Sequence, residues 1–346
     1  MPIVPNFIER LILFRLNLGP GLVLDLFGGF AFRAAAVANR LGVFEVLSRG
    51  PLTAVEVARQ IEADERGTTR LLEALDAVGY VKKKRDGRYA ATAMTAKWLP
   101  RLAGGLRASE RALLQPLEYL EESIRTGEPA FNSYERYAEM DRSWWRDQQD
   151  AMIAVAHMVG DDIVARVKLP ETARRLLDVG GGHGLHAIKF CRRYPQLSAT
   201  VFDLPQALEV AREVIAAEAM GERVSVQAGD FWKDDLGNGY DAALVFSILQ
   251  MNSPDKNTEL LRKVAGALNP GGLVVIQDQI AGRAPSPTAK AIISLQGLSQ
   301  LVSSRGRTYA FDEIAGWLTD AGFSKPRRIN LWKTPGVGLV VGTKAA

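Results

Sequence analysis

The chain has 346 residues, of which 47% are hydrophobic and 24% charged, and its formal net charge is +4. This is the composition of a folded globular protein with room for two domains, and so mild a charge does not call for a nucleic-acid partner. The single cysteine, Cys191, excludes an internal disulfide framework, and three scattered histidines do not predict a metal site. We therefore expect a cytoplasmic protein without a bound metal.

Charged side chains interrupt the apolar N-terminal residues 7–32, and Gly19-Pro20-Gly21 would break a helix there. The longest run without a charge, Leu16–Leu24, has nine residues, whereas a membrane span needs about 20. No small-residue cleavage site follows a charged start. The pattern predicts helices that bury against a partner chain or the second domain, and no membrane span. Binding at a membrane surface is the alternative.

Residues 30–100 predict three helices and a hairpin. Apolar residues recur at helical spacing over Ala34–Leu47. Thr53 and Glu56 have the spacing of a capping box, which begins a second helix. A third helix is expected over Glu65–Val78, and Arg85-Asp86-Gly87 forms the turn between two short strands. Three helices followed by such a hairpin are typical of a winged helix.

A winged helix raises the possibility of DNA binding, with a basic hairpin that carries Lys82, Lys83, Lys84, Arg85 and Arg88. The third helix argues against it. There the positive charges of Arg66 and Arg70 are balanced by Glu65, Glu73 and Asp76, which would face phosphates unfavourably. A charged hairpin is also what any solvated turn contains. We expect no nucleic-acid partner and keep a DNA-binding regulator as a remote alternative.

Strand-like and helix-like runs alternate from residue 174 onward, after a helical connector rich in aromatic residues. This alternation indicates an α/β fold with a parallel sheet between helices. Strands are predicted over Arg175–Val179, Ala199–Asp203, Val224–Ala228, Ala242–Ile248 and Leu273–Asp278. Helices are predicted over His186–Tyr194, Gln206–Ala219, Asp255–Leu268 and Phe311–Ala321. The last two strands, Arg327–Leu331 and Gly338–Thr343, are expected to pair as an antiparallel hairpin.

Four glycines lie close together where the first of these strands ends, in Asp178-Val179-Gly180-Gly181-Gly182-His183-Gly184. Glycine lets the backbone approach a ligand closely, and the start of the following helix offers N–H groups. A dinucleotide fingerprint would need a third glycine where this chain has Leu185, so no pyrophosphate is expected. The negative charge of Asp178 suits the ammonium group of an amino-acid ligand instead.

Two more aspartates stand where later strands end. Asp203 ends the second strand, where a carboxylate can bind both hydroxyls of a ribose. Asp230 follows the third strand together with Phe231 and Trp232, which suit an adenine amino group and its ring face. Because the carboxyl ends of parallel strands border the crevice where open sheets bind ligands, we expect the three carboxylates at one site.

Several segments resemble the small-molecule O-methyltransferases of plants and of bacterial natural-product pathways. They are Arg175–Gly184, Thr200–Pro205, Gly229-Asp230-Phe231 and Asn269-Pro270-Gly271-Gly272. The resemblance covers nearly the whole chain. It implies S-adenosylmethionine as the cofactor, a Rossmann-like class I methyltransferase sheet with helices on both faces, an N-terminal all-helical winged-helix dimerisation domain, and a homodimer that uses the apolar N-terminus. The implied domains are residues 1–105 for dimerisation, 106–172 for a connector that lines the substrate pocket, and 173–346 for cofactor binding and catalysis.

The same resemblance implies the site residues. Those for the cofactor are Asp178, Gly180, Gly182, Asp203, Leu204, Asp230, Phe231 and Ser247. Those for a small-molecule acceptor are Trp145, Met152, Phe246, Gln250, Met251, Leu295 and Leu298. The second set is mostly apolar and aromatic, which indicates a flat hydrophobic acceptor.

The chain departs from the family at the residue that should act as the base. In the family, a histidine after the fourth strand deprotonates the acceptor hydroxyl, and this chain has Gln250 at that position. An amide cannot accept a proton near neutral pH. Of the two acidic residues that usually flank the histidine, one remains as Asp278 and the other falls near Gly306.

Three explanations of Gln250 remain open. Methyl transfer to carbon or nitrogen would need little deprotonation, and Gln250 would then orient the acceptor. O-methylation could use another base, for which His157 is the candidate, although a surface pair with Asp161 four residues away would explain His157 equally well. The third explanation is a cofactor-binding enzyme of the same fold whose reaction transfers no methyl group.

Overall fold

The computed structural model describes residues 3–109, 114–131, 140–282, 286–331 and 337–345. They form two compact units, Met1–Glu110 and Arg111–Ala346. The division falls five residues after the boundary expected from the sequence, and the helical connector belongs to the second unit.

The first unit consists of helices and one small hairpin. Its elements are α1 (Phe7–Arg10), the π-helical turn η1 (Leu11–Arg15), α2 (Leu22–Arg40), α3 (Val43–Ser48), α4 (Ala54–Gln60), α5 (Glu65–Ala77), β1 (Val81–Lys83), β2 (Tyr89–Ala91) and α6 (Ala93–Ser109). The predicted capping box begins α4: the Thr53 hydroxyl accepts from the Glu56 N–H, and the Glu56 carboxylate accepts from the Thr53 N–H. β1 and β2 pair antiparallel around the predicted turn.

The single helix expected over Ala34–Leu47 is wrong, because the chain turns at Gly42 between α2 and α3. Gly42 has a φ of +79°, in the left-handed region that glycine adopts at little cost. Apolar spacing continues across this turn, so the pattern alone did not reveal the break.

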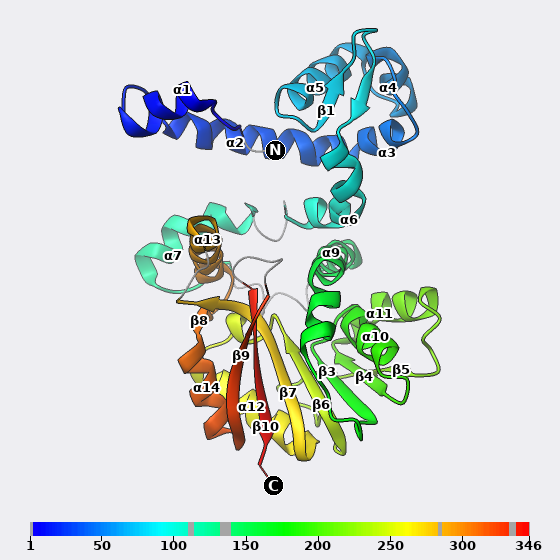
Figure 1. Ribbon diagram of the computed structural model, residues 1–346, viewed down its shortest axis with the longest axis vertical. Helices are drawn as coiled ribbons and strands as arrows, with labels where there is room; N and C mark the ends of the chain where they lie inside the picture. The colour runs from blue at the N-terminus through cyan, green and yellow to red at the C-terminus, as the bar shows by residue number, and fades with distance from the viewer. Residues whose placement is uncertain (1–2, 110–113, 132–139, 283–285, 332–336, 346) are drawn as a thin grey trace. The chain divides into compact units, whose positions relative to one another are not determined.

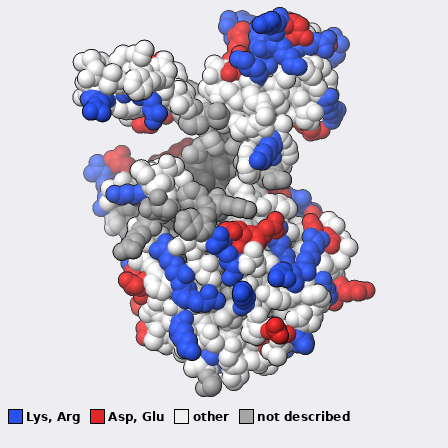
Figure 2. Space-filling view, viewed as in Figure 1, with Lys and Arg blue, Asp and Glu red and all other residues white. Residues whose placement is uncertain are grey.

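The N-terminal elements of the first unit carry many exposed apolar side chains. They are Ile3, Val4, Phe7, Ile8, Leu11, Ile12, Phe14, Leu16, Leu18, Leu22, Val23, Leu26, Phe27 and Phe30. Figure 2 shows a largely uncharged surface over α1 and the start of α2. By length and composition alone, α2 could cross a membrane, the one such helix in the described chain. So large an exposed apolar surface marks a contact site.

The second unit contains the sheet. Its helical elements are the 3₁₀ turn η3 (Pro116–Tyr119), α7 (Leu120–Thr126), α9 (Arg142–Arg166), α10 (Leu185–Arg193), α11 (Pro205–Ala217), the 3₁₀ turn η5 (Leu249–Met251), α12 (Pro254–Ala267), α13 (Pro287–Ser303) and α14 (Phe311–Asp320). Its strands are β3 (Arg175–Val179), β4 (Ser198–Asp203), β5 (Val224–Ala228), β6 (Tyr240–Phe246), β7 (Leu268–Ala281), β8 (Tyr309–Ala310), β9 (Phe323–Asn330) and β10 (Val337–Lys344).

The strands lie in the order β5-β4-β3-β6-β7-β10-β9, with β8 beside β7 (Figure 1). The first five are parallel. β10 runs antiparallel to β9, as predicted, and it also runs antiparallel to β7. Alternate strand residues enter opposite cores. Leu176 packs with α9, α10 and α11 on one face, and Leu177 packs with α12 and α14 on the other. The predicted arrangement, a largely parallel sheet with helices on both faces, is confirmed.

β6 ends earlier than predicted, at Phe246 rather than Ile248. Ser247 has a φ of +58°, which no regular strand accommodates, and its N–H donates to the Gln277 carbonyl on β7. This turn sends the chain out of the sheet and into η5. The residue after it, Ile248, therefore reaches the glycine loop instead of extending the strand.

Candidate functional site

The glycine loop between β3 and α10 is the centre of the site. Gly180, Gly182 and Gly184 have φ values of +63°, +51° and +72°, which side-chain-bearing residues rarely adopt. The Gly180 N–H donates to the Phe202 carbonyl of β4 at 2.8 Å. This bond holds the loop over the carboxyl ends of the strands, where ligands of open parallel sheets bind.

Asp203 lies at the end of β4 with both oxygens engaged by backbone. Its Oδ2 accepts from the Gly182 N–H and its Oδ1 from the Leu204 N–H, each at 2.7 Å. Burial raises the pKa of Asp203 to about 6, and these two N–H groups oppose the rise. Each oxygen keeps a lone pair for a further donor. The carboxylate is thereby aimed and held, with the capacity to accept from two vicinal hydroxyls.

Asp178 lies beneath the loop and is only 2% exposed. Burial, with a smaller contribution from the charge of Asp203, raises the pKa of Asp178 to about 7. The Ala187 N–H acts in the opposite direction and lowers this pKa. In the described chain its Oδ2 has no hydrogen-bond partner. A buried acceptor without a donor is costly, so this oxygen fits a site that receives a cationic group.

Phe231 borders the loop from the other side. A methyl group built on Gly180 would lie 3.6 Å from the Phe231 ring, which also packs against Trp232 with 5.0 Å between ring centroids. Asp230 is held in its own turn by the Trp232 N–H at 2.9 Å and pairs with Lys233. Partial burial raises the pKa of Asp230, but the Lys233 hydrogen bond and the Trp232 N–H outweigh it and leave the pKa lowered.

The long helix α9 packs over the loop, and it adds a residue that the sequence analysis missed. A methyl group built on Gly182 would lie 2.5 Å from Oε1 of Gln149, which is 6% exposed. Gln149 stands four residues after Trp145 and three before Met152, so these side chains share one helix face. Because Trp145 and Met152 were both expected at the site, this spacing was a signal that could have identified Gln149.

Gln250 lies in η5, directly after the turn at Ser247. Its side-chain Oε1 is buried and has no hydrogen-bond partner within the described residues. The turn is fixed by its neighbours: the Asn257 amide donates to the Leu249 carbonyl at 3.0 Å, and the Tyr309 hydroxyl donates to the Asn252 carbonyl. The site therefore presents an amide acceptor on a well-held turn.

Asp278 and Gly306 lie at the two positions where the resemblance implies acidic residues beside the base. Burial raises the pKa of Asp278 well above its ordinary value. The nearby N–H groups of Gln250 and Leu249 oppose this rise, although neither forms a hydrogen bond with the carboxyl oxygens. Gly306 lies so close to η5 that a methyl group built on it would be 2.1 Å from the Gln250 carbonyl oxygen. A side chain at position 306 therefore has no room.

The histidines lie next to the loop on the α9 side. His183 accepts from the Leu185 N–H at its Nδ1, and burial, then the charge of His157, lower the pKa of His183 to about 4. His157 itself is exposed on α9. Asp161, its expected partner, forms its ion pair with Lys189. His186 is buried against the Phe246 ring with 4.8 Å between ring centroids.

The remaining acceptor residues lie in three places. Phe246 is 8% exposed and belongs to the core beneath α9 and α10. Met251 is half-buried in η5. On α13, Leu298 is half-buried and Leu295 is 66% exposed. The structure thus places Trp145 and Met152 on α9 and Gln250 in the turn after β6. Phe246 is buried in the core, and Leu295 is exposed on α13.

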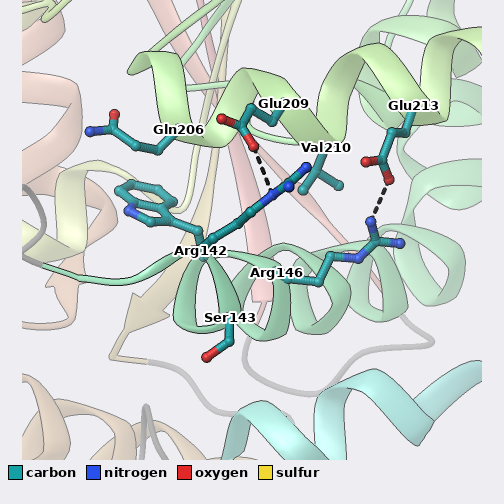
Figure 3. A pocket seen from close by; sticks show the side chains of 8 residues that line it. Arg142, Ser143, Arg146, Gln206, Glu209, Val210 and Glu213 are labelled. Carbon is teal, nitrogen blue, oxygen red and sulfur yellow. Dashed lines mark hydrogen bonds and ion pairs between the residues drawn. The ribbon is translucent and has the colours of Figure 1, made fainter.

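A cavity of about 400 Å³ lies between α9 and α11, beside the carboxyl end of β4. Its charged lining residues pair across the cavity: Arg142 with Glu209 at 3.1 Å, and Arg146 with Glu213 (Figure 3). These ion pairs join α9 to the helix that follows Asp203. They are exposed, so their contribution to stability is small.

Comparison with known proteins agrees with this arrangement. The sequence matches the family model of the O-methyltransferase domain over residues 119–324 and that of the O-methyltransferase dimerisation domain over residues 24–101. A 3-hydroxy-5-methyl-1-naphthoate 3-O-methyltransferase of Streptomyces sahachiroi is 32% identical over 94% of this chain and 96% of its own length. An L-tyrosine C(3)-methyltransferase of Streptomyces lavendulae is 25% identical over 94% of this chain and 92% of its own. The structure of the S-adenosylmethionine-dependent methyltransferase SibL is 30% identical, with a TM-score of 0.69 over 94% of this chain and 99% of that one.

Proposed function

The chain belongs to the S-adenosylmethionine-dependent O-methyltransferase family, and we propose that it methylates a small aromatic metabolite without a histidine base. The observation that carries this proposal is Gln250, whose buried Oε1 has no partner in the described chain, in the position of the family's base. The half-buried Met152 and Met251 nearby favour an apolar acceptor.

The residues around the glycine loop fit the cofactor. Asp203 would accept from the ribose hydroxyls, Phe231 would cover the adenine ring, and the unpartnered oxygen of Asp178 would face the methionine end. When bound, the cofactor supplies a methyl group made electrophilic by the sulfonium charge. The protein's part is to hold the acceptor atom in line with that methyl group and to exclude water.

Gln250 limits which acceptor atoms can react. Its amide can accept a hydrogen bond from an acceptor hydroxyl but cannot remove the proton. A phenol with an ordinary pKa of about 10 then stays protonated, and its oxygen is a poor nucleophile. A ring carbon beside that hydroxyl, an aromatic amine, which is unprotonated near neutral pH, or a hydroxyl acidic enough to ionise by itself remains nucleophilic. After transfer to a ring carbon, the C–H bond there breaks and its proton leaves to water as the ring becomes aromatic again. Carbon methylation is supported by the relative named as an L-tyrosine C(3)-methyltransferase.

The position of the transferred methyl group tests this proposal. With S-adenosylmethionine carrying a ¹³C-methyl group and a panel of hydroxynaphthoates, catechols and tyrosine, we expect NMR of the products to show methyl on carbon or nitrogen. Methyl on oxygen is expected only for hydroxyls already ionised at the assay pH. Gln250→Met, which keeps the length of the side chain, should lower kcat and leave S-adenosylhomocysteine affinity unchanged.

Rapid O-methylation of a phenol with an ordinary pKa at pH 7 would contradict the proposal, because it requires a base. Loss of that activity in His157→Ala would then identify His157 as the base. Cofactor binding without methyl transfer to any member of the panel would favour a non-methylating enzyme.

We propose further that the protein is a cytoplasmic homodimer. In it, the first unit is a winged helix, and a second copy covers the apolar face of α1, η1 and α2.

We expect light scattering to give the mass of a dimer for the wild-type protein. The double substitution Phe27→Glu with Phe30→Glu should give monomers, because the two exposed rings would be replaced by charges. Val55→Glu, an exposed apolar residue on α4, is the matched control and should stay dimeric. Wild-type monomers that float with lipid vesicles would contradict the dimer and favour a membrane surface.

A further inference from the structure

Gln149 is a buried polar side chain for which the fold provides no partner. It is 6% exposed, and its Oε1 accepts no hydrogen bond from any described residue. Buried amides normally find partners, so an unmet acceptor at a ligand site indicates a donor that the ligand brings.

The position of Gln149 ties it to one end of the cofactor site. Its Oε1 lies within 2.5 Å of where a side chain on Gly182 would begin, and the Gly182 N–H donates to Asp203. At the preceding residue, a methyl group built on Gly181 would lie 2.8 Å from the unpartnered Oδ2 of Asp178. Two acceptors without donors therefore flank adjacent residues of the loop.

We infer that Gln149 accepts a hydrogen bond from the α-ammonium group at the amino-acid end of the cofactor. This inference rests on the proposed function. An ammonium group has three N–H donors and no acceptor, so it needs acceptors from several directions. Asp178 provides a charged oxygen from beneath the loop, and Gln149 provides a neutral one from α9. A neutral second acceptor binds the cation without adding another buried negative charge.

Helix α9 holds this amide in place from both sides. Arg146 pairs with Glu213 of α11 on one side, and Asp161 pairs with Lys189 of α10 on the other. Burial of Gln149 leaves few side-chain conformations to lose on binding. The acceptor is therefore fixed before the ligand arrives, which lowers the entropic cost of the contact.

Binding of two nucleosides, one with the amino-acid end and one without it, distinguishes this contact from the rest of the site. S-adenosylhomocysteine contains the amino-acid end, and 5′-methylthioadenosine lacks it. We expect Gln149→Ala to weaken S-adenosylhomocysteine binding about tenfold in calorimetry, the loss of roughly one hydrogen bond to a charged group, and to leave 5′-methylthioadenosine affinity unchanged. Gln149→Glu keeps an acceptor and should bind S-adenosylhomocysteine at least as well as wild type.

Controls make each outcome decisive. Gln148→Ala, at the half-buried neighbouring position, should change neither affinity. Equal weakening of both nucleosides in Gln149→Ala would show a structural role and overturn the inference. Weakened binding in Gln149→Glu would place the contact at the carboxylate end instead and also overturn it. If wild type bound neither nucleoside, the proposed function itself would fail.

Discussion

Asp203→Ala is expected to weaken S-adenosylhomocysteine binding by about 100-fold. The substitution removes two charge-assisted hydrogen bonds to the ribose, worth about 1.5 kcal/mol each at the low end, and about 1.4 kcal/mol corresponds to tenfold in affinity. It also leaves the Gly182 and Leu204 N–H groups without the acceptor that orders the loop. Calorimetry measures the loss directly, and the thermal shift that the ligand gives wild type should disappear.

Asp241→Ala is the matched control. Asp241 also accepts from two backbone N–H groups, those of Arg174 and Arg175 at 2.7 and 3.0 Å, but at the opposite end of the sheet. Its loss should lower the melting temperature and leave the affinity for S-adenosylhomocysteine unchanged. An affinity near that of wild type in Asp203→Ala would remove Asp203 from the ribose site.

Gly306→Ala should lower kcat by about tenfold or more while the affinity for S-adenosylhomocysteine stays within about twofold. The new methyl group would lie 2.1 Å from the Gln250 carbonyl oxygen and 2.6 Å from two backbone carbons, so η5 must move. Overpacking of this kind destabilises a fold by about 1–3 kcal/mol. The shift of η5 also displaces Gln250 from the acceptor, and a loss of about 1.4 kcal/mol of transition-state stabilisation is tenfold in rate. Steady-state kinetics with an acceptor from the panel, together with calorimetry, separates the two effects.

Gly316→Ala is the control for this glycine. It lies within α14 with no atom within 4 Å of the added methyl group, so it should be neutral or slightly stabilising. If Gly306→Ala behaved like Gly316→Ala in both assays, the close approach of position 306 to η5 would have no functional weight.

The close approach of Gly306 to the backbone of η5 also explains why Gln250→His alone does not rebuild a histidine with two acidic neighbours. Gln250→His would place an imidazole near Asp278, and burial, which raises the pKa of that carboxyl, disfavours the negative charge that would stabilise an imidazolium. The second acidic residue cannot be added at Gly306, because the backbone of η5 occupies the space. Gln250 and Gly306 therefore belong to one tightly packed turn region.

The sequence predicted the sheet and the cofactor loop well, because both depend on local patterns. Runs of apolar residues marked β3 to β7, and Asp203 was recognisable from its place at a strand end. The Thr53 capping box was equally readable from two residues at fixed spacing. These features are set by a few neighbours in the chain, so a single sequence contains what is needed to find them.

What the sequence could not predict depends on contacts between distant segments. The helical spacing of Gln149 from Trp145 and Met152 places it on their face of the helix, but its close approach to Gly182 is seen only in the structure. Phe246 was expected at the acceptor site from the resemblance alone, and its contact with the His186 ring joins segments far apart in the sequence. The raised pKa of Asp278 likewise follows from burial, which residue spacing in the sequence does not reveal.

Helix α9 has a consequence for how the substrate range of such a protein can change. Trp145, Gln149 and Met152 lie on one face, three and four residues apart, and about 4.5 Å of helix axis separates Gln149 from Met152. A rigid helix transmits little movement between neighbouring positions on its surface. Because the proposed acceptor residue Met152 and the proposed cofactor residue Gln149 are separate positions on this helix, we expect replacements at Met152 to alter acceptor choice and to leave Gln149 in place. We therefore expect natural or engineered substitutions to change the acceptor while the proposed contact with the cofactor stays intact.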